Sequence, residues 1–394
     1  MQATALAGRG EGADMLINVC LTGIDVRWPP IRDSQFGGVD MKKVLVVLVV
    51  CAWLASGRFS APLQAQSNGP KFEIDPSWPK PLPEGWIIGR TGSTCVDAHD
   101  HLIVTNRRDI TAEEAETSKQ APSILIFDLA GNLVNSWGDS DTVPGTIHGC
   151  FADRENNIWL TGNGDGIIQK WTHDGKLLMQ IGKRGVFDSS DGSSKGKNLN
   201  ASPTQFFNPA GIVVDPANGD VYIADGYGNR RVAVFDRQGK FLRQWGHQAT
   251  KEETDAGAGG AFAQIVHCIA MGNDGLIYVC DRQGDRVQVF DKMGNFKKNI
   301  WIRTGTPTLP DPRGTVWWIG FSRDPEQKFM YVMNGRNEQC TFSITRPGRF
   351  CRASAAPGTC SVISPTAIPS RSTPKGICIS RKLTRAAGFR NSAL

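Results

Sequence analysis

The chain has 394 residues, of which 40% are hydrophobic and 44 are glycine, a composition that suits one large or two ordinary turn-rich globular domains. Its net charge of +6 comes from the tail, because nine Lys and Arg and no acidic residue follow Gln339. The rest of the chain therefore carries a net negative charge, and composition excludes nucleic acid as an expected partner.

The first segment with a recognisable pattern is a predicted signal peptide at residues 41–65. Two lysines, an apolar run and small residues before Gln66 are typical of a secretory signal. The run, residues 44–55, is shorter than the ~20 residues that span a bilayer, so we expect no membrane span after cleavage. We interpret residues 1–40 as disordered upstream sequence read as protein, and we expect the mature protein to be secreted or periplasmic.

A repeat then runs through the main body of the chain, residues 66–339. Four twelve-residue stretches align without gaps, each with an aromatic residue, a turn with glycine at the fifth place and a strand that ends in a large apolar residue. This is the pattern of a β-hairpin, and a second hairpin precedes each copy. The stretches are 127–138, 171–182, 235–246 and 290–301, and a fifth copy of the preceding hairpin begins at residue 321.

Each repeat unit holds about four short strands, which is one blade of a β-propeller. The sequence therefore predicts an all-β fold. We expect a six-bladed β-propeller, of which about four and a half blades are readable as written. The long connectors at 183–203 and 247–261 are rich in Gly, Ser and charge and are predicted to be surface loops.

Residues 340–394 have four Cys and break the repeat inside the fifth blade. In a shifted reading frame, the codons that follow Gln339 permit the second half of that blade and then a sixth. We therefore predict that residues 340–394 are frameshifted and are not a native domain. Since an open ring exposes sheet edges, the chain as written is expected to be incomplete and inactive.

Four cysteines lie in the readable part of the chain: Cys95, Cys150, Cys268 and Cys280. An exported protein can pair some of them as disulfides. Sequence alone leaves the pairing open.

Two of the six histidines share one predicted structural position. His148 and His267 stand at the start of the innermost strand in blades two and four. The shifted frame allows a third His at that position in blade six, where Asn, Asp or Tyr fit the codon equally. Alternate blades of a six-bladed ring are roughly 120° apart, so three imidazoles would converge on the axis and hold zinc with an open fourth position. The alternative is that these histidines hydrogen-bond to neighbouring strands.

The other four histidines have no predicted role. Two are expected to be solvated in an exposed turn, and two follow blade hairpins. They are His99 and His101, and His173 and His247.

The repeats resemble NHL-repeat propellers, most closely in "DGYGNRRVAVFD" (225–236) and "DRQGDRVQVFD" (281–291). Over roughly residues 84–339 the chain also resembles the peptidyl-α-hydroxyglycine α-amidating lyase family. That resemblance is carried by "ADGYGNRRVAVFDRQGKFLRQWG" (224–246), "IHGCFAD", "VHCIAMG" and "MNGRNEQ". It implies a zinc-dependent lyase that splits a carbinolamide into an amide and glyoxylate.

The resemblance also implies roles for single residues. His148 and His267 correspond to zinc ligands, Tyr227 of "DGYGN" to the catalytic base, and Arg107 of "IVTNRRD" to the catalytic Arg that holds the substrate carboxylate. Arg108 is the alternative register. The third zinc ligand is absent from the chain as written.

Tyr227 and Arg107 each have a simpler interpretation, and the chain departs from the family at one position. Tyr227 can cap the inter-strand turn, and Arg107 can pair with Asp109. Gly228 stands where the animal enzymes have a disulfide cysteine, so that cross-link is missing here.

Two other classes of function remain open. One is a non-catalytic scaffold that binds a protein, peptide or glycan through the propeller loops. The other is a calcium-dependent lactonase-like propeller, although such a channel wants Glu, Asp and Asn where this chain offers His. We therefore expect zinc, with a structural calcium as a second candidate ion. The expected partners are a small-molecule or peptide substrate, or a protein at the loops, and we expect a monomer.

Overall fold

The structure is a computed structural model in which residues 75–302 and 314–335 are described in full, together with the backbone of five further strands. Those strands are β1 (Val19–Leu21), β2 (Ile24–Val26), β25 (Gln339–Ile344), β26 (Ser361–Val362) and β27 (Cys378–Ile379). The chain divides into two compact units, Met1–Gln66 with the antiparallel pair β1–β2, and Ser67–Leu394, which holds everything below. The predicted signal peptide and most of the predicted frameshifted tail lie outside the described residues.

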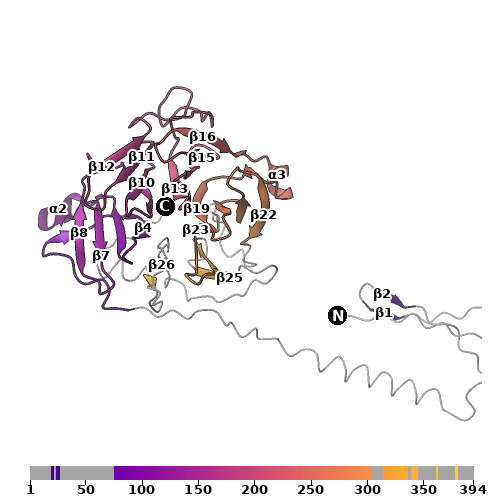
Figure 1. Cartoon of the computed structure of the whole chain (residues 1–394), viewed down its shortest axis with the longest axis horizontal. Helices are drawn as coiled ribbons and strands as arrows, with labels where there is room; N and C mark the ends of the chain where they lie inside the picture. The colour runs from indigo at the N-terminus through magenta and orange to yellow at the C-terminus, as the bar shows by residue number, and fades with distance from the viewer. Residues whose placement is uncertain are drawn as a thin grey trace, which may run out of the picture. The chain divides into compact units, whose positions relative to one another are not determined.

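Four antiparallel sheets of four strands follow one another along the second unit, and each corresponds to one predicted blade (Figure 1). Blade 1 contains β4 (Thr91–Val96), β5 (Leu102–Asn106), β7 (Ile124–Phe127) and β8 (Leu133–Trp137). Blade 2 contains β9 (Ile147–Ala152), β10 (Ile158–Gly162), β11 (Ile167–Trp171) and β12 (Leu177–Ile181). Blade 3 contains β13 (Pro209–Val214), β14 (Val221–Asp225), β15 (Arg231–Phe235) and β16 (Phe241–Trp245). Blade 4 contains β19 (Val266–Met271), β20 (Ile277–Asp281), β21 (Arg286–Phe290) and β22 (Phe296–Trp301).

Blade 5 is a three-stranded sheet of β23 (Val316–Phe321), β24 (Phe329–Asn334) and β25. Its third strand begins at Gln339, where the shifted frame also places a strand. The fold is therefore all-β, a β-propeller as predicted. The predicted sixth blade lies outside the described residues.

The elements between the blades are short. β3 (Trp86–Ile87) pairs in parallel with β6 (Lys119–Gln120), and β17 (His247–Gln248) with β18 (Ala261–Phe262). Two six-residue helices, α2 (Ala112–Thr117) and α3 (Lys251–Ala256), each begin with a capping box. Within the described ranges, we find no helix whose length and apolar character would let it cross a membrane.

The repeated glycine acts as the sequence predicts. Gly131, Gly175, Gly239 and Gly294 have φ of 83°, 88°, 81° and 91°, a left-handed conformation that costs a glycine little. Each closes the hairpin between the third and fourth strands of its blade, so the repeat and the strand spacing have one physical cause.

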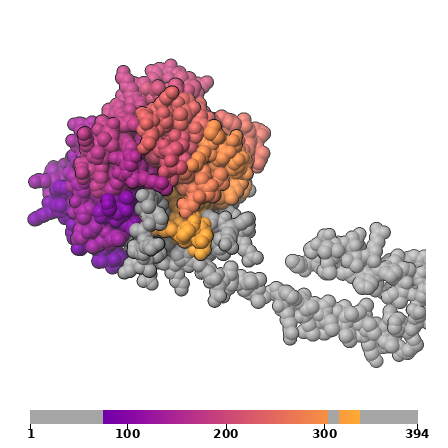
Figure 2. Space-filling model, in the orientation of Figure 1, coloured from indigo at the N-terminus to yellow at the C-terminus, as the bar shows by residue number. Residues whose placement is uncertain are grey.

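The first strand of each blade lies against the first strand of the next. β4 contacts β9, β9 contacts β13, β13 contacts β19, and β19 contacts β23. In Figure 1 the blades follow in chain order, from indigo through magenta to orange, around these strands, and Figure 2 shows the same order of colours on the surface. The innermost strands therefore line a common channel.

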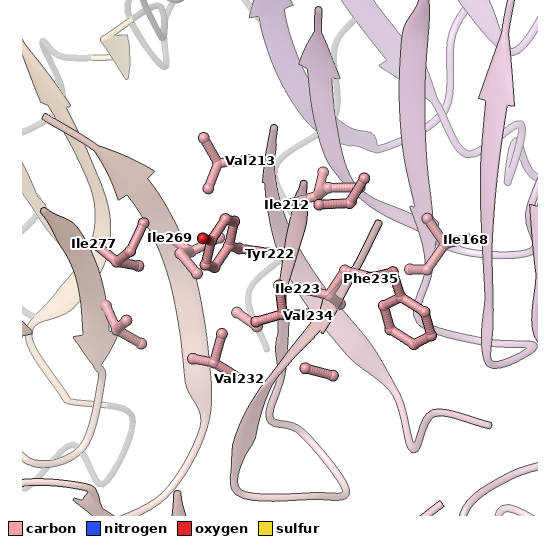
Figure 3. Close-up of a cluster of buried hydrophobic side chains, with 14 of the residues drawn as sticks. Ile168, Ile212, Val213, Tyr222, Ile223, Val232, Val234, Phe235, Ile269 and Ile277 are labelled. Atoms are coloured by element: carbon pink, nitrogen blue, oxygen red, sulfur yellow. The ribbon is translucent and has the colours of Figure 1, made fainter. Parts of the chain in front are cut away.

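The core lies between the faces of neighbouring blades. Every residue of β15 is buried, because blade 3 is covered on both faces, by blade 2 and by blade 4. Figure 3 shows Phe235 on the side of Ile168 of blade 2, and Val232 on the side of Ile277 of blade 4. The alternation of side chains along a strand thus supplies apolar surface to both neighbours.

The repeat also places a buried ion pair in blades 3 and 4. The Nε of Arg231 lies 2.9 Å from Oδ2 of Asp225, and the Nε of Arg286 lies 2.8 Å from Oδ2 of Asp281. All four side chains are fully buried. Each pair connects the second strand of its blade with the third.

The four cysteines of the readable region form two disulfides. Cys95 of β4 is bonded to Cys150 of β9, which links blade 1 to blade 2. Cys268 of β19 is bonded to Cys280 of β20 within blade 4. The pairing that the sequence leaves open is thus set by which cysteines face each other on adjacent strands.

Candidate functional site

One end of the channel collects the polar residues that the sequence singles out. His148 is the second residue of β9, and His267 is the second residue of β19, so the two share the predicted position. In an antiparallel pair, the start of a blade's first strand lies beside the end of its second strand. Arg107 directly follows β5 and Tyr227 follows β14 by two residues, which brings all four to the same end.

The channel contains a cavity of about 80 Å³ lined by the innermost strands. Its lining includes Thr94, His148, Gly211, His267 and Trp317, one from each of the five blades. This volume is enough for an ion and a small polar group.

The hydroxyl of Tyr227 lies between the two histidines. Its oxygen is 3.1 Å from Nε2 of His148 and 3.1 Å from Nε2 of His267. The two imidazoles meet edge to face, with ring centroids 4.9 Å apart. The interpretation of Tyr227 as a turn cap accounts for its backbone, whose N–H donates to Asn208, but the side chain points to the histidines.

Backbone carbonyls determine which nitrogen of each histidine carries the proton. Nδ1 of His148 is 3.3 Å from the carbonyl oxygen of Ala210, and Nδ1 of His267 is 2.6 Å from that of Trp317. Because a carbonyl oxygen only accepts, each Nδ1 is the donor and each Nε2 bears a lone pair. Both lone pairs therefore face the region of the Tyr227 hydroxyl.

Burial keeps both imidazoles neutral. It lowers the pKa of His148 to about 4, and the nearby Arg107 adds to this effect. Burial, together with His148 and Arg282, also holds the pKa of His267 well below its usual value. A neutral imidazole whose Nε2 carries a lone pair is the form that binds a metal.

A second arginine, Arg282, completes the cluster. Its guanidinium donates to the Tyr227 hydroxyl at 3.1 Å and stacks on the Trp317 ring at 4.4 Å from the centroid. Burial raises the pKa of Tyr227, while the positive charges of Arg282 and Arg107 act in the opposite direction. Since Arg282 donates to that oxygen, the tyrosine's own proton is directed toward a histidine Nε2.

Of the two alternatives Arg107 and Arg108, Arg107 is the one that lies in this cluster. Its Nε donates to the carbonyl of Ile147 at 3.1 Å, next to His148. Asp109, the alternative partner, contacts Arg90 through a close ion pair. Arg108 instead donates to the carbonyl of Ala121 at 2.9 Å.

Arg282 is the residue that the sequence reasoning missed. It directly follows Asp281, the last residue of β20, just as Arg107 follows Asn106, the last residue of β5. The equivalence between "VTNR" and "VCDR" at the end of the second strand was the available signal.

The remaining histidines depart in part from the prediction. The side chain of His99 is 67% exposed, as expected for a solvated residue. His101 and His173 are only partly exposed, and both lie against the buried carboxylate of Asp97. The expectation that His101 is solvated in an exposed turn was therefore wrong, because it ignored the packing of one blade on the next.

The donor set of the channel fits zinc in part. The two neutral imidazole nitrogens are suitable zinc ligands, and the hydrogen bonds made by each Nδ1 hold the rings in place. The Tyr227 phenol oxygen lies beside them. The third histidine of the predicted site would come from blade six, outside the described residues.

Residues 206–235 match the NHL repeat family. Over 339 residues the chain is 26% identical to NHL repeat-containing protein 3 of Mus musculus, a match that covers 84% of this chain and 85% of that protein. It is 29% identical over 190 residues to peptidyl-alpha-hydroxyglycine alpha-amidating lyase 1 of Drosophila melanogaster, which covers 47% of this chain and 32% of the lyase.

Among solved structures, virginiamycin B lyase from Staphylococcus aureus, crystallised as a catalytically inactive variant with quinupristin, is 15% identical. The match has a TM-score of 0.45 and covers 70% of this chain and 73% of that one. The chain thus carries an NHL repeat and folds as a β-propeller. Its distant relatives include a hydroxyglycine amidating lyase.

Proposed function

We propose that this chain, in its complete form, is an exported zinc-dependent lyase that cleaves a peptidyl-α-hydroxyglycine into a peptide amide and glyoxylate. The observation that carries the proposal is the Tyr227 hydroxyl, held between two imidazole Nε2 atoms and beside a guanidinium. The similarity to a hydroxyglycine amidating lyase supports the substrate class.

In this reaction the substrate hydroxyl loses its proton, the carbinol carbon becomes the aldehyde of glyoxylate as the C–N bond breaks, and the amide nitrogen gains a proton. Zinc bound by His148 and His267 would supply a Lewis acid for the substrate oxygen. Tyr227 is the group that moves the proton, as base toward the hydroxyl and as acid toward the leaving nitrogen.

The two arginines give the site its preference for an anion. Arg107 and Arg282 place two positive charges beside Tyr227, and both act on its pKa. Arg107 binds the carboxylate of the hydroxyglycine, which a guanidinium can hold through two hydrogen bonds. Arg282 holds the Tyr227 oxygen in position and favours its ionised form.

The test uses the protein with the shifted frame restored after Gln339, loaded with zinc and given an N-acyl-α-hydroxyglycine. We expect glyoxylate release, a loss of about 10²–10⁴-fold in kcat for Tyr227→Phe, and loss of zinc for His148→Ala. Tyr222→Phe is the matched control, because this buried tyrosine bonds Arg243 away from the channel. An intact, zinc-loaded protein that releases no glyoxylate would contradict the proposal.

The second candidate is a non-catalytic scaffold that binds a protein, peptide or glycan at its loops. It is supported by the similarity to NHL repeat-containing protein 3 over 84% of the chain, a protein whose name states only the repeat. Absence of both zinc and glyoxylate release in the frame-restored protein would favour this function.

A further inference from the structure

A second cluster of metal-binding side chains lies away from the candidate active site, where blade 1 meets blade 2. Asp97, in the turn between β4 and β5, is fully buried. Its Oδ2 lies 2.8 Å from Nε2 of His173, in the turn between β11 and β12, and 3.1 Å from Nδ1 of His101. The three ligand atoms all lie within 4.8 Å of one another.

The carboxylate of Asp97 is held in a fixed orientation. Its Oδ1 accepts hydrogen bonds from the backbone N–H groups of His99 and His101, each at 2.8 Å. An oriented carboxylate oxygen therefore faces the two imidazoles.

The buried Nδ1 of His101 is not satisfied by a hydrogen bond, which indicates that this nitrogen is available to bind a metal. The atom has no hydrogen-bond partner, although Oδ2 of Asp97 is 3.1 Å away. Zinc bonds of about 2.0–2.1 Å imply that ligand atoms of a tetrahedral site are about 3.3 Å apart, close to the two distances found here.

The turn that carries His173 is itself fixed by blade 1. The carbonyl oxygen of His173 accepts hydrogen bonds from Trp137 Nε1 at 3.0 Å and from Asn135 Nδ2 at 3.2 Å, both in β8. The imidazole is thus presented to Asp97 by contacts that do not depend on the carboxylate. The side chains of His101 and His173 are 27% and 23% exposed, which leaves one side open to solvent.

From these contacts we propose that Asp97, His101 and His173 bind a zinc-type divalent ion, with water as the fourth ligand, that links blade 1 to blade 2. Two nitrogens and one carboxylate oxygen suit zinc, whereas calcium and magnesium take oxygen ligands. The role is structural and does not rest on the proposed lyase function. It adds to the Cys95–Cys150 disulfide, which joins the same two blades.

The experiment uses the full chain with His148→Gln and His267→Gln, so that the channel cannot contribute metal. After removal of metal with a chelator and addition of Zn²⁺ or Co²⁺, we expect one equivalent to remain after desalting. Cobalt should give the intense visible absorption of a tetrahedral site. The individual substitutions His101→Ala and His173→Gln should each abolish that equivalent and the accompanying rise in Tm.

His247→Ala is the matched control. Its side chain is 56% exposed and pairs with Glu253, and the variant should bind metal like the background. If the channel substitutions prevent folding, the His101 and His173 variants are made without them. Each should then bind one equivalent of metal less than the control. Equal metal content in all variants, or none in the background, would overturn the site.

Discussion

His148 and His267 meet edge to face in the channel, with ring centroids 4.9 Å apart and ring planes at 89°. Each faces the same Tyr227 hydroxyl, and neither can gain a proton without placing a positive charge beside Arg107 or Arg282. Protonation of either histidine therefore destabilises the folded protein.

This arrangement predicts that stability falls in acid. The pKa of His148 is about 4 in the folded protein and about 6.5 in the unfolded chain, so between these values the unfolded chain binds more protons. The free energy of unfolding should thus decrease as the pH falls from about 6.5 to 4, by about 3 kcal/mol from His148 alone. The urea midpoint measured against pH checks this.

The control for the pH dependence is a matched pair of variants. His148→Gln should flatten the slope between about pH 6.5 and 4, because glutamine does not titrate. His247→Gln changes an exposed histidine paired with Glu253 and should leave the slope in place. Identical slopes in the two variants would show that His148 does not carry the effect.

The buried Arg231–Asp225 pair predicts a large loss of stability on truncation. Arg231→Ala leaves the Asp225 carboxylate buried, with Asn229 as a neutral partner, and should cost about 3–5 kcal/mol in urea unfolding. Arg237→Ala is the control, since its pair with Glu155 is more than half exposed on both sides and should matter by less than about 1 kcal/mol. Similar losses in both variants would contradict the importance of burial.

The blades and the shared position of His148 and His267 could be predicted from sequence because both follow from local, repeated rules. A glycine at the fifth place closes a hairpin by its own conformational freedom, as the φ of 83° at Gly131 shows. Counting five residues back from the acidic turn after a blade's first strand, at Asp153 and Gly272, is then enough to assign a histidine to the start of that strand.

The Asp97 cluster could not be found in this way. His101 is close to Asp97 in the chain, but His173 reaches it only because the hairpin of blade 2 lies on Trp137 of blade 1. The same holds for Cys95 and Cys150, which come together through contact between β4 and β9. Contacts between blades depend on tertiary packing, for which a single blade's pattern carries no signal.

The break in the repeat predicts the result of resequencing the gene around the Gln339 codon. We expect one base to have been lost there, so that the corrected frame encodes the rest of blade 5 and a sixth blade. A histidine five residues before the acidic turn of that blade would supply the third channel ligand. A single intact frame that encodes residues 340–394 as written would exclude this explanation.

The two disulfides predict a ranking of stability on removal. Cys95–Cys150 closes a loop with a sequence separation of 55, and Cys268–Cys280 one of 12. Loop-closure entropy predicts losses of about 4 and about 3 kcal/mol for the paired Cys→Ala variants. Only the first also joins two blades, so its loss should broaden the urea transition as blade 1 separates from blade 2 before the rest unfolds.

Urea unfolding of both variants, followed by tryptophan fluorescence and circular dichroism, measures the ranking and the cooperativity. A larger loss for the Cys268–Cys280 variant, or coincident sharp transitions in the Cys95–Cys150 variant, would show that the inter-blade link does not hold these blades together.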